Sequence, residues 1–213
     1  MEALAQGDVE TARDIARDNL RAFAELARRG YRIVCPEPTA AVTLRKDYLD
    51  LLDDPDARLV ADHTVELTAY LWELHERGQL PTDFRPLPLP LGHHVPCHVK
   101  ALGGTPAGPS LLGLISKTRV HTIDVSCSGM AGTYGLRAEA YETSLAAGRP
   151  MLDELRRPGV MFGSTECSAC RLQMEEGSGK RTLHPVQYLA LAYGLMPELA
   201  RRLRTRGARR VVQ

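Results

Sequence analysis

Four short hydrophobic runs each lead into a cysteine, and this arrangement constrains the fold more than any other feature. The runs cover residues 31–34, 91–95, 120–125 and 160–163, and the cysteines that follow are Cys35, Cys97, Cys127, Cys167 and Cys170. If the runs are parallel strands, their carboxyl ends meet at one edge, where open α/β sheets bind ligands. The pattern predicts an α/β fold with a mostly parallel sheet flanked by helices, and with all the cysteines at the C-terminal edge of the strands.

Helical patterns alternate with these runs. Asp8 is placed to cap a helix that ends at Gly30, and apolar spacing predicts further helices over residues 40–52 and 62–77. Four prolines within residues 79–90 predict a stiff, extended linker. The alternation of strands and helices favours a parallel sheet with helices on its faces.

A weak internal repeat divides the chain at this linker. Cys35 and Cys167 each follow a strand and precede a helix, and a later helix in each half begins near a histidine, His63 or His184. We therefore expect residues 1–85 to be the closing half of a first cysteine-rich repeat. Residues 86–213 would be a complete second repeat with a basic C-terminal tail.

Composition limits the compartment and the class of partner. A net charge of +1 over 213 residues argues against nucleic-acid binding, which needs a basic excess. Neither a secretory signal nor a bilayer-spanning apolar run is visible, so the expected location is cytoplasmic or peripheral at the inner face of the membrane. In a reducing cytoplasm, five cysteines are better explained as metal or redox ligands than as disulfides.

The spacing Cys167-Ser-Ala-Cys170 serves zinc, iron–sulfur clusters and dithiol redox chemistry, and two more cysteines at other strand ends make the signal more specific. Placed at a helix start, with Ser164 or Thr165 as the cap, these thiols would face the positive end of the helix dipole, which favours thiolate. A set of four cysteines suits an iron–sulfur cluster or tetrahedral zinc. The alternative is that Cys35, Cys97 and Cys127 are buried small hydrophobic residues.

Two further groups of residues could support a bound cofactor. The run Cys127-Ser-Gly-Met-Ala-Gly-Thr-Tyr-Gly places Gly129 and Gly132 where backbone N–H groups can approach sulfur or phosphate, or it forms only a tight turn. His98 and His184 could tune a cluster, ligate zinc, or act as loop or capping residues. His93 and His94 are expected at the surface at a strand end, and Glu166 as a solvated carboxylate.

The motifs together resemble a known family. Pro96-Cys97-His98, the glycine run from Cys127, Glu166-Cys167-Ser-Ala-Cys170 and His184-Pro185 resemble the cysteine-rich CCG domain. This domain occurs in iron–sulfur subunits of anaerobic glycerol-3-phosphate dehydrogenase, of glycolate or D-lactate oxidases, and of heterodisulfide reductase. The resemblance implies that the cluster ligands are Cys97, Cys127, Cys167 and Cys170.

The resemblance also implies a function and shows one departure. The expected function is an iron–sulfur electron-transfer module of a flavin-linked oxidoreductase acting on a 2-hydroxy acid or glycerol 3-phosphate. A [4Fe–4S] cluster would take electrons from FAD on a partner domain or subunit and pass them to a carrier or quinone-linked partner. Ser128 stands where the family has a second adjacent cysteine, so a structural zinc module and a metal-free interaction domain stay open. Cys35 matches the first cysteine of the CxxC in the first repeat, with Pro38 at its partner position.

Overall fold

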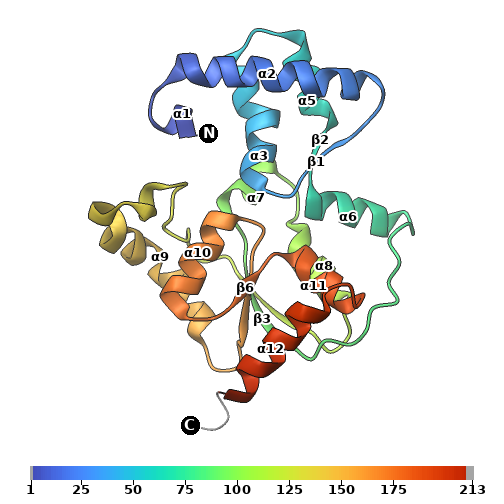
Figure 1. The fold of residues 1–213 in the computed structure, drawn as a ribbon, viewed down its shortest axis with the longest axis vertical. Helices are drawn as coiled ribbons and strands as arrows, with labels where there is room; N and C mark the ends of the chain where they lie inside the picture. The colour runs from blue at the N-terminus through green and yellow to red at the C-terminus, as the bar shows by residue number, and fades with distance from the viewer. Residues whose placement is uncertain (1, 210–213) are drawn as a thin grey trace.

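The computed structural model describes residues 2–209 and has the predicted α/β fold, with parallel strands flanked by helices (Figure 1). The strands form two sheets. One sheet pairs β1 (Ile33–Cys35) with β2 (Thr64–Glu66). The other has the order β4-β3-β5-β6 and consists of β4 (Arg119–Ile123), β3 (Pro90–His94), β5 (Phe162–Ser164) and β6 (Thr182–Leu183).

Helices surround both sheets. Residues 2–78, here called the N-terminal lobe, contain α1 (Glu2–Ala5), α2 (Val9–Arg28), α3 (Pro38–Val42), a π-helical turn (Thr43–Asp47), α4 (Tyr48–Leu51), α5 (Pro55–His63) and α6 (Leu67–Glu76). Residues 90–209, the C-terminal lobe, contain α7 (Cys97–Leu102), α8 (Ala107–Gly113), α9 (Tyr141–Arg156), α10 (Ser168–Ser178), α11 (Pro185–Ala192) and α12 (Pro197–Arg209). Two short 3₁₀ turns, Tyr134–Leu136 and Ala138–Ala140, lead into α9.

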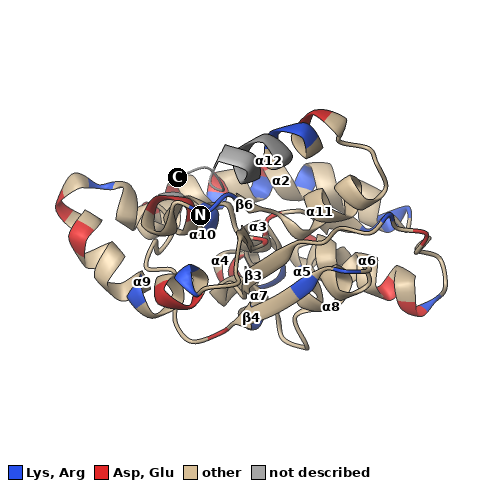
Figure 2. Ribbon diagram, turned by 90° about the horizontal axis from the view of Figure 1, so that it is seen from below, with Lys and Arg blue, Asp and Glu red and all other residues tan. Residues whose placement is uncertain are grey.

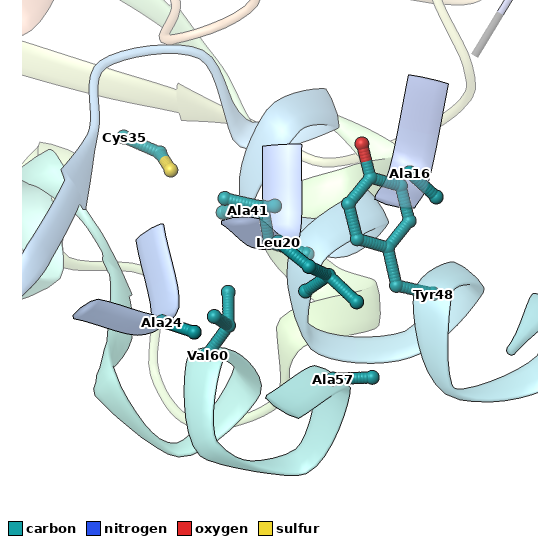
Figure 3. Packing of buried hydrophobic residues seen from close by; sticks show 9 residues of the cluster. Ala16, Leu20, Ala24, Cys35, Ala41, Tyr48, Ala57 and Val60 are labelled. Atoms are coloured by element: carbon teal, nitrogen blue, oxygen red, sulfur yellow. The ribbon is translucent and has the colours of Figure 1, made fainter. Parts of the chain in front are cut away.

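The N-terminal lobe has its own hydrophobic core. Asp8 caps α2 as predicted, by accepting a hydrogen bond from the backbone N–H of Thr11. The buried face of α2 packs on α5, and Figure 3 shows Cys35 in the same cluster as Leu20 and Val60. Cys35 ends β1, so it lies at the C-terminal edge of a strand as predicted, but it is 5% exposed and serves as a core residue, and it is not among the residues that line the cysteine pocket.

The helix predicted over residues 62–77 is interrupted by a strand. α5 ends at His63, β2 takes Thr64–Glu66, and α6 begins at Leu67. The β-branched pair Thr64 and Val65 favours strand, and parallel pairing with β1 buries both side chains. The helical spacing of the flanking residues concealed this short strand.

The proline-rich segment between the lobes is extended, as predicted. It runs along the C-terminal lobe, where the Arg85 N–H donates to the Ala192 carbonyl at 2.9 Å and the Leu87 N–H to the Ser116 carbonyl at 3.1 Å. Phe84, Leu87 and Leu89 pack against the core that Leu91 and Tyr188 belong to. The segment therefore connects the lobes and also covers part of the second core.

Charged residues of both signs are mixed along the outer helices. In Figure 2 both acidic and basic positions occur on α9, and the chain as a whole has a net charge of +1. None of the helices in the described part of the chain combines the length and the apolar character needed to cross a bilayer. The side chains of the basic tail beyond Leu203, including Arg206, Arg209 and Arg210, lie outside the described residues.

The two lobes contain the same local arrangement. In the first, β1 leads into α3, and the parallel strand β2 leads into α6; in the second, β5 leads into α10, and β6 leads into α11. The helix caps are Glu37 and Glu66 in the first and Cys167 and His184 in the second. The strand registers agree with this matching, since Ile33 pairs with Thr64 as Gly163 pairs with Thr182.

This register changes one sequence-based assignment. It makes Glu37 the counterpart of Cys167 and Ala40 the counterpart of Cys170. Cys35 corresponds to Thr165, so the sequence-based matching of Cys35 and Pro38 to the CxxC was wrong by two residues. The first lobe thus has the same strand–helix frame, with other residue types at the positions that match the cysteines.

Candidate metal centre

The second lobe brings the four predicted ligand cysteines to one pocket. Cys97 starts α7, Cys127 lies in the loop after β4, and Cys167 and Cys170 lie at the cap and in the first turn of α10. All four line a cavity of about 400 Å³, together with Thr39 and His98 among others. Three separate stretches of sequence therefore converge because β3, β4 and β5 are parallel and end at the same edge.

The sulfur atoms form two unlike pairs. Cys97 Sγ and Cys127 Sγ lie 3.7 Å apart and both residues are exposed. Cys167 and Cys170 are buried, and the Ser128 hydroxyl donates to Cys170 Sγ at 3.2 Å. Within residues 2–209, no three His, Cys, Asp or Glu side chains form a group that could hold one metal ion.

Hydrogen bonding and burial separate the acidities of the thiols. A hydrogen bond from the Cys170 side chain lowers the pKa of Cys167 and raises the pKa of Cys170. Burial, followed by the nearby Cys127, raises the pKa of Cys97. Cys167 is therefore the sulfur that these neighbours favour as a thiolate, the form that binds metal.

The start of α10 is built differently from the sequence-based prediction. Neither Ser164 nor Thr165 caps the helix; Cys167 occupies the cap position itself, without a capping bond from its side chain. The Ser164 hydroxyl instead lies 3.2 Å from Nδ1 of His93. The carboxylate of Glu37, from the N-terminal lobe, accepts the hydrogen bond of the Ser168 N–H at 2.9 Å.

The glycine loop supports the site through backbone geometry. The Gly129 N–H points to Cys127 Sγ at 3.3 Å, which is the kind of donor that the sequence predicts for a sulfur ligand. Gly129 has a φ of +88°, and a Cβ there would lie 2.0 Å from the Ser144 carbonyl oxygen of α9. Close packing on α9 thus requires glycine at 129, whereas Gly132 lines the pocket.

The two predicted accessory histidines have different positions. His98 lines the pocket, and its Nδ1 lies 2.8 Å from the Thr39 hydroxyl. His184 is not among the described residues that line the pocket; its Nδ1 accepts from the Val186 N–H at 3.1 Å and caps α11. The capping role that sequence reasoning left open for His184 is therefore the one observed.

A buried polar pair next to the cysteines was not anticipated. His93, His94 and Glu166 are all almost fully buried, so the predictions of surface histidines and a solvated carboxylate were wrong. His93 Nε2 lies 3.5 Å from Glu166 Oε1, and Gly108 of α8 leaves room for both, since a Cβ there would lie 2.0 Å from that oxygen.

Burial determines the charge state of this pair. It raises the pKa of Glu166 to about 8 and lowers that of His93 to about 3. β3 lies between β4 and β5, and helices cover both faces of such a parallel sheet, which explains the burial of His93. No local pattern in the sequence signals this burial, since it follows from the order of the strands.

Comparisons with known proteins agree with the motifs. Residues 91–175 match the family model described as a cysteine-rich domain, CCG. A subunit of anaerobic glycerol-3-phosphate dehydrogenase from Escherichia coli, in strain K12 and in O157:H7, is 32% identical over 190 residues, which cover 89% of this chain and 48% of that protein. D-2-hydroxyglutarate dehydrogenase of Pantoea ananatis (strain AJ13355) is 34% identical over 95 residues, or 43% of this chain and 9% of that protein.

These matches confirm the resemblance inferred from the cysteine motifs. The match to the Escherichia coli proteins extends beyond the cysteine-rich domain into the N-terminal lobe, because 190 residues exceed the length of the C-terminal lobe. The chain spans about half the length of these two relatives.

Proposed function

With residues 91–175 taken as a cysteine-rich domain of the CCG family, we propose that this chain is an iron–sulfur electron-transfer module of a flavin-linked dehydrogenase. The observation that carries the proposal is the pocket lined by Cys97, Cys127, Cys167 and Cys170. Thiolates are the ligands that iron–sulfur clusters require, and four of them complete an ordinary [4Fe–4S] site. When bound, the cluster would supply one-electron transfer.

The residues around the pocket fit such a group. The Gly129 N–H and the Ser128 hydroxyl already donate to sulfur, and hydrogen bonds to sulfur help to set the potential of a cluster. The buried side of the pocket, at Cys167 and Cys170, would exclude water, while Cys97 and Cys127 face the surface. An exposed side is what electron exchange with a partner needs.

Substrate and partners follow from the relatives. One relative is named for glycerol 3-phosphate and another for D-2-hydroxyglutarate, which are both small anions that carry an oxidisable hydroxyl group. We propose that a partner domain or subunit with FAD oxidises a substrate of this class, a 2-hydroxy acid or glycerol 3-phosphate. Electrons would pass through this chain to a carrier or quinone-linked partner, in the cytoplasm or at the inner face of the membrane.

The domain division belongs to the same proposal. Residues 1–85 would be the closing half of a first repeat, and residues 86–213 a complete domain that holds the cluster. The matched β1–α3–β2–α6 and β5–α10–β6–α11 arrangements support this division.

Zinc is the second candidate because of one distance, although the described residues do not bring a third ligand to the same point. The edge of a tetrahedral four-thiolate zinc site is about 3.8 Å, and Cys97 Sγ and Cys127 Sγ lie 3.7 Å apart. A structural zinc ion would make the chain an assembly module of the same kind of complex. A metal-free interaction domain is the third candidate.

Metal analysis separates the three. The chain is purified without oxygen, and iron, sulfide and zinc are measured per chain together with the visible absorption spectrum. About four irons with matching sulfide and a brown colour support the cluster. One zinc per chain in a colourless protein supports the second candidate. No metal in the purified protein, and none after reconstitution, supports the third.

A further inference from the structure

Glu37 joins the two lobes at the cysteine site. It lies just after β1, yet its Oε2 accepts the hydrogen bond of the Ser168 N–H at 2.9 Å, across 131 positions of sequence. Ser168 is the first residue of α10, the helix that carries Cys170 and is preceded by Cys167. The N–H groups of a first helical turn have no partner within the helix, so this carboxylate supplies an acceptor that Cys167 does not.

The other oxygen of the same carboxylate, Oε1, is connected by hydrogen bonds to α7, the second helix that carries a cysteine. The Thr39 hydroxyl donates to Glu37 Oε1 at 3.3 Å, and His98 Nδ1 lies 2.8 Å from the same hydroxyl. With Thr39 donating to the carboxylate, Nδ1–H of His98 donates to the Thr39 hydroxyl. His98 follows Cys97 at the start of α7.

Packing reinforces this connection. α3, which begins at Pro38, packs against α7, and Figure 1 shows the two helices together between the lobes. Lys46 donates to the Ala101 carbonyl near the end of α7. The N-terminal lobe therefore holds α7 near both of its ends and holds α10 at its start.

We propose that Glu37 is a positioning residue of the cysteine site, which fixes the helices bearing Cys97 and Cys167 and places a fixed negative charge beside them. The inference rests on the proposed cluster function. It also gives the altered first lobe a role, because Glu37 is the counterpart of Cys167 in the matched arrangement. A negative charge near the sulfurs disfavours adding an electron, so Glu37 would lower the reduction potential.

Two substitutions separate position from charge. Glu37→Ala removes both hydrogen bonds. Glu37→Gln keeps the shape, because its amide oxygen can accept from Ser168 while its NH₂ donates to Thr39, but it removes the charge. Asp54→Ala is the matched control, since Asp54 caps α5 in the same lobe by accepting from the Asp56 N–H at 2.8 Å, without contact to the pocket.

The measurements are iron per chain after reconstitution and the midpoint potential of the cluster. We expect Glu37→Ala to lose iron at least threefold relative to the wild type and to Asp54→Ala. Glu37→Gln is expected to keep its iron and to show a higher potential than the wild type. Iron retention by Glu37→Ala would overturn the positioning role, and an unchanged potential in Glu37→Gln would overturn the role of the charge.

A second readout does not depend on the cluster. In the metal-free chain, we expect amide hydrogen exchange at the start of α10 to become faster in Glu37→Ala and to stay unchanged in Asp54→Ala. Equal exchange in the wild type and Glu37→Ala would overturn the inference. A wild-type chain that takes up no iron would instead contradict the proposed function, and the exchange experiment would still test the contact.

Discussion

The β1–α3–β2–α6 arrangement of the first lobe and the β5–α10–β6–α11 arrangement of the second share a frame but differ in chemistry. In the second, Cys167 and Cys170 open the helix after the strand and line the pocket. In the first, the same two positions are Glu37 and Ala40, and Cys35 belongs to the core. The frame depends on strand pairing and caps, and many residue types satisfy these, whereas the metal site depends on individual sulfur atoms.

The difference also extends to the buried acid. Glu166 precedes Cys167 and is buried against His93, while its counterpart in the first lobe is the exposed Pro36. The lobe that lacks the cysteine pair therefore has no carboxylate at this position, although it buries another one, Glu66, at the start of α6. We infer that Glu166 belongs with the cysteines as a unit, and that the first lobe retains only the scaffold.

The largest expected effect comes from replacing one cysteine in each lobe and comparing the two variants. Cys167→Ser removes the thiolate that its surroundings favour most, so most of the iron should be lost. Cys35→Ala removes a buried core sulfur outside the pocket and should leave most of the iron in place. Iron per chain after anaerobic reconstitution measures both. Equal loss of iron in the two variants would show that the lobes share the site, and the comparison would fail.

The second effect concerns the pH dependence of stability. Native Glu166 binds its proton up to about pH 8, whereas in the unfolded chain the group titrates near its ordinary value of 4.5. Between these values the native state binds more protons than the unfolded state, so the contribution of Glu166 to the free energy of unfolding falls as pH rises. Glu166→Gln removes this dependence.

Urea unfolding at pH 5 and pH 8 measures this effect. From pH 5 to pH 8, the difference in the free energy of unfolding between Glu166→Gln and the wild type should shift in favour of the variant by on the order of 2–5 kcal/mol. Glu10→Gln, on the exposed surface of α2, is the matched control, and its effect should be within about 0.5 kcal/mol at both pH values. If the gap between Glu166→Gln and the wild type does not change with pH, Glu166 is ionised in the native state and the pair differs from our description.

The sequence predicted the parts of this molecule that depend on pattern. Hydrophobic runs before Cys97, Cys127 and Cys167 were enough to place three strands in one parallel sheet, and parallel ends made the convergence of the cysteines a geometric consequence. The long periodic helix with its cap at Asp8 was predicted for the same reason. These features arise from many residues acting together, so no single substitution hides them.

What the sequence concealed depends on tertiary contacts. Thr64–Glu66 is too short a strand to show a period, and only pairing with β1 reveals it. The acceptor for the first N–H of α10, that of Ser168, comes from Glu37 in the other lobe, which no local pattern at Ser164 or Thr165 could indicate. The burial of His93 and Glu166 depends on strand order, since β3 becomes central only when β4 and β5 are placed on either side.

The smallest effect tests the matched caps of the second helices. Glu66 Oε2 accepts from the Thr68 N–H, the Thr68 hydroxyl and the Ala69 N–H, at 2.9, 2.6 and 3.0 Å. His184 accepts one such bond, from Val186. Losing a cap costs about 0.5–2 kcal/mol. We expect Glu66→Ala to lie near the upper end of that range and His184→Ala near the lower end, measured by urea unfolding at pH 7.

This last comparison tests whether the equivalent cap positions of the two lobes contribute equally to the free energy of unfolding. Because Glu66 satisfies three donors, its loss leaves more hydrogen bonds unmade than the loss of His184. A double variant should show nearly additive losses if each cap serves only its own helix, because independent sites add. A clearly smaller combined loss would show that the two caps interact across the interface between the lobes, and the lobes would then have to be treated as one cooperative unit.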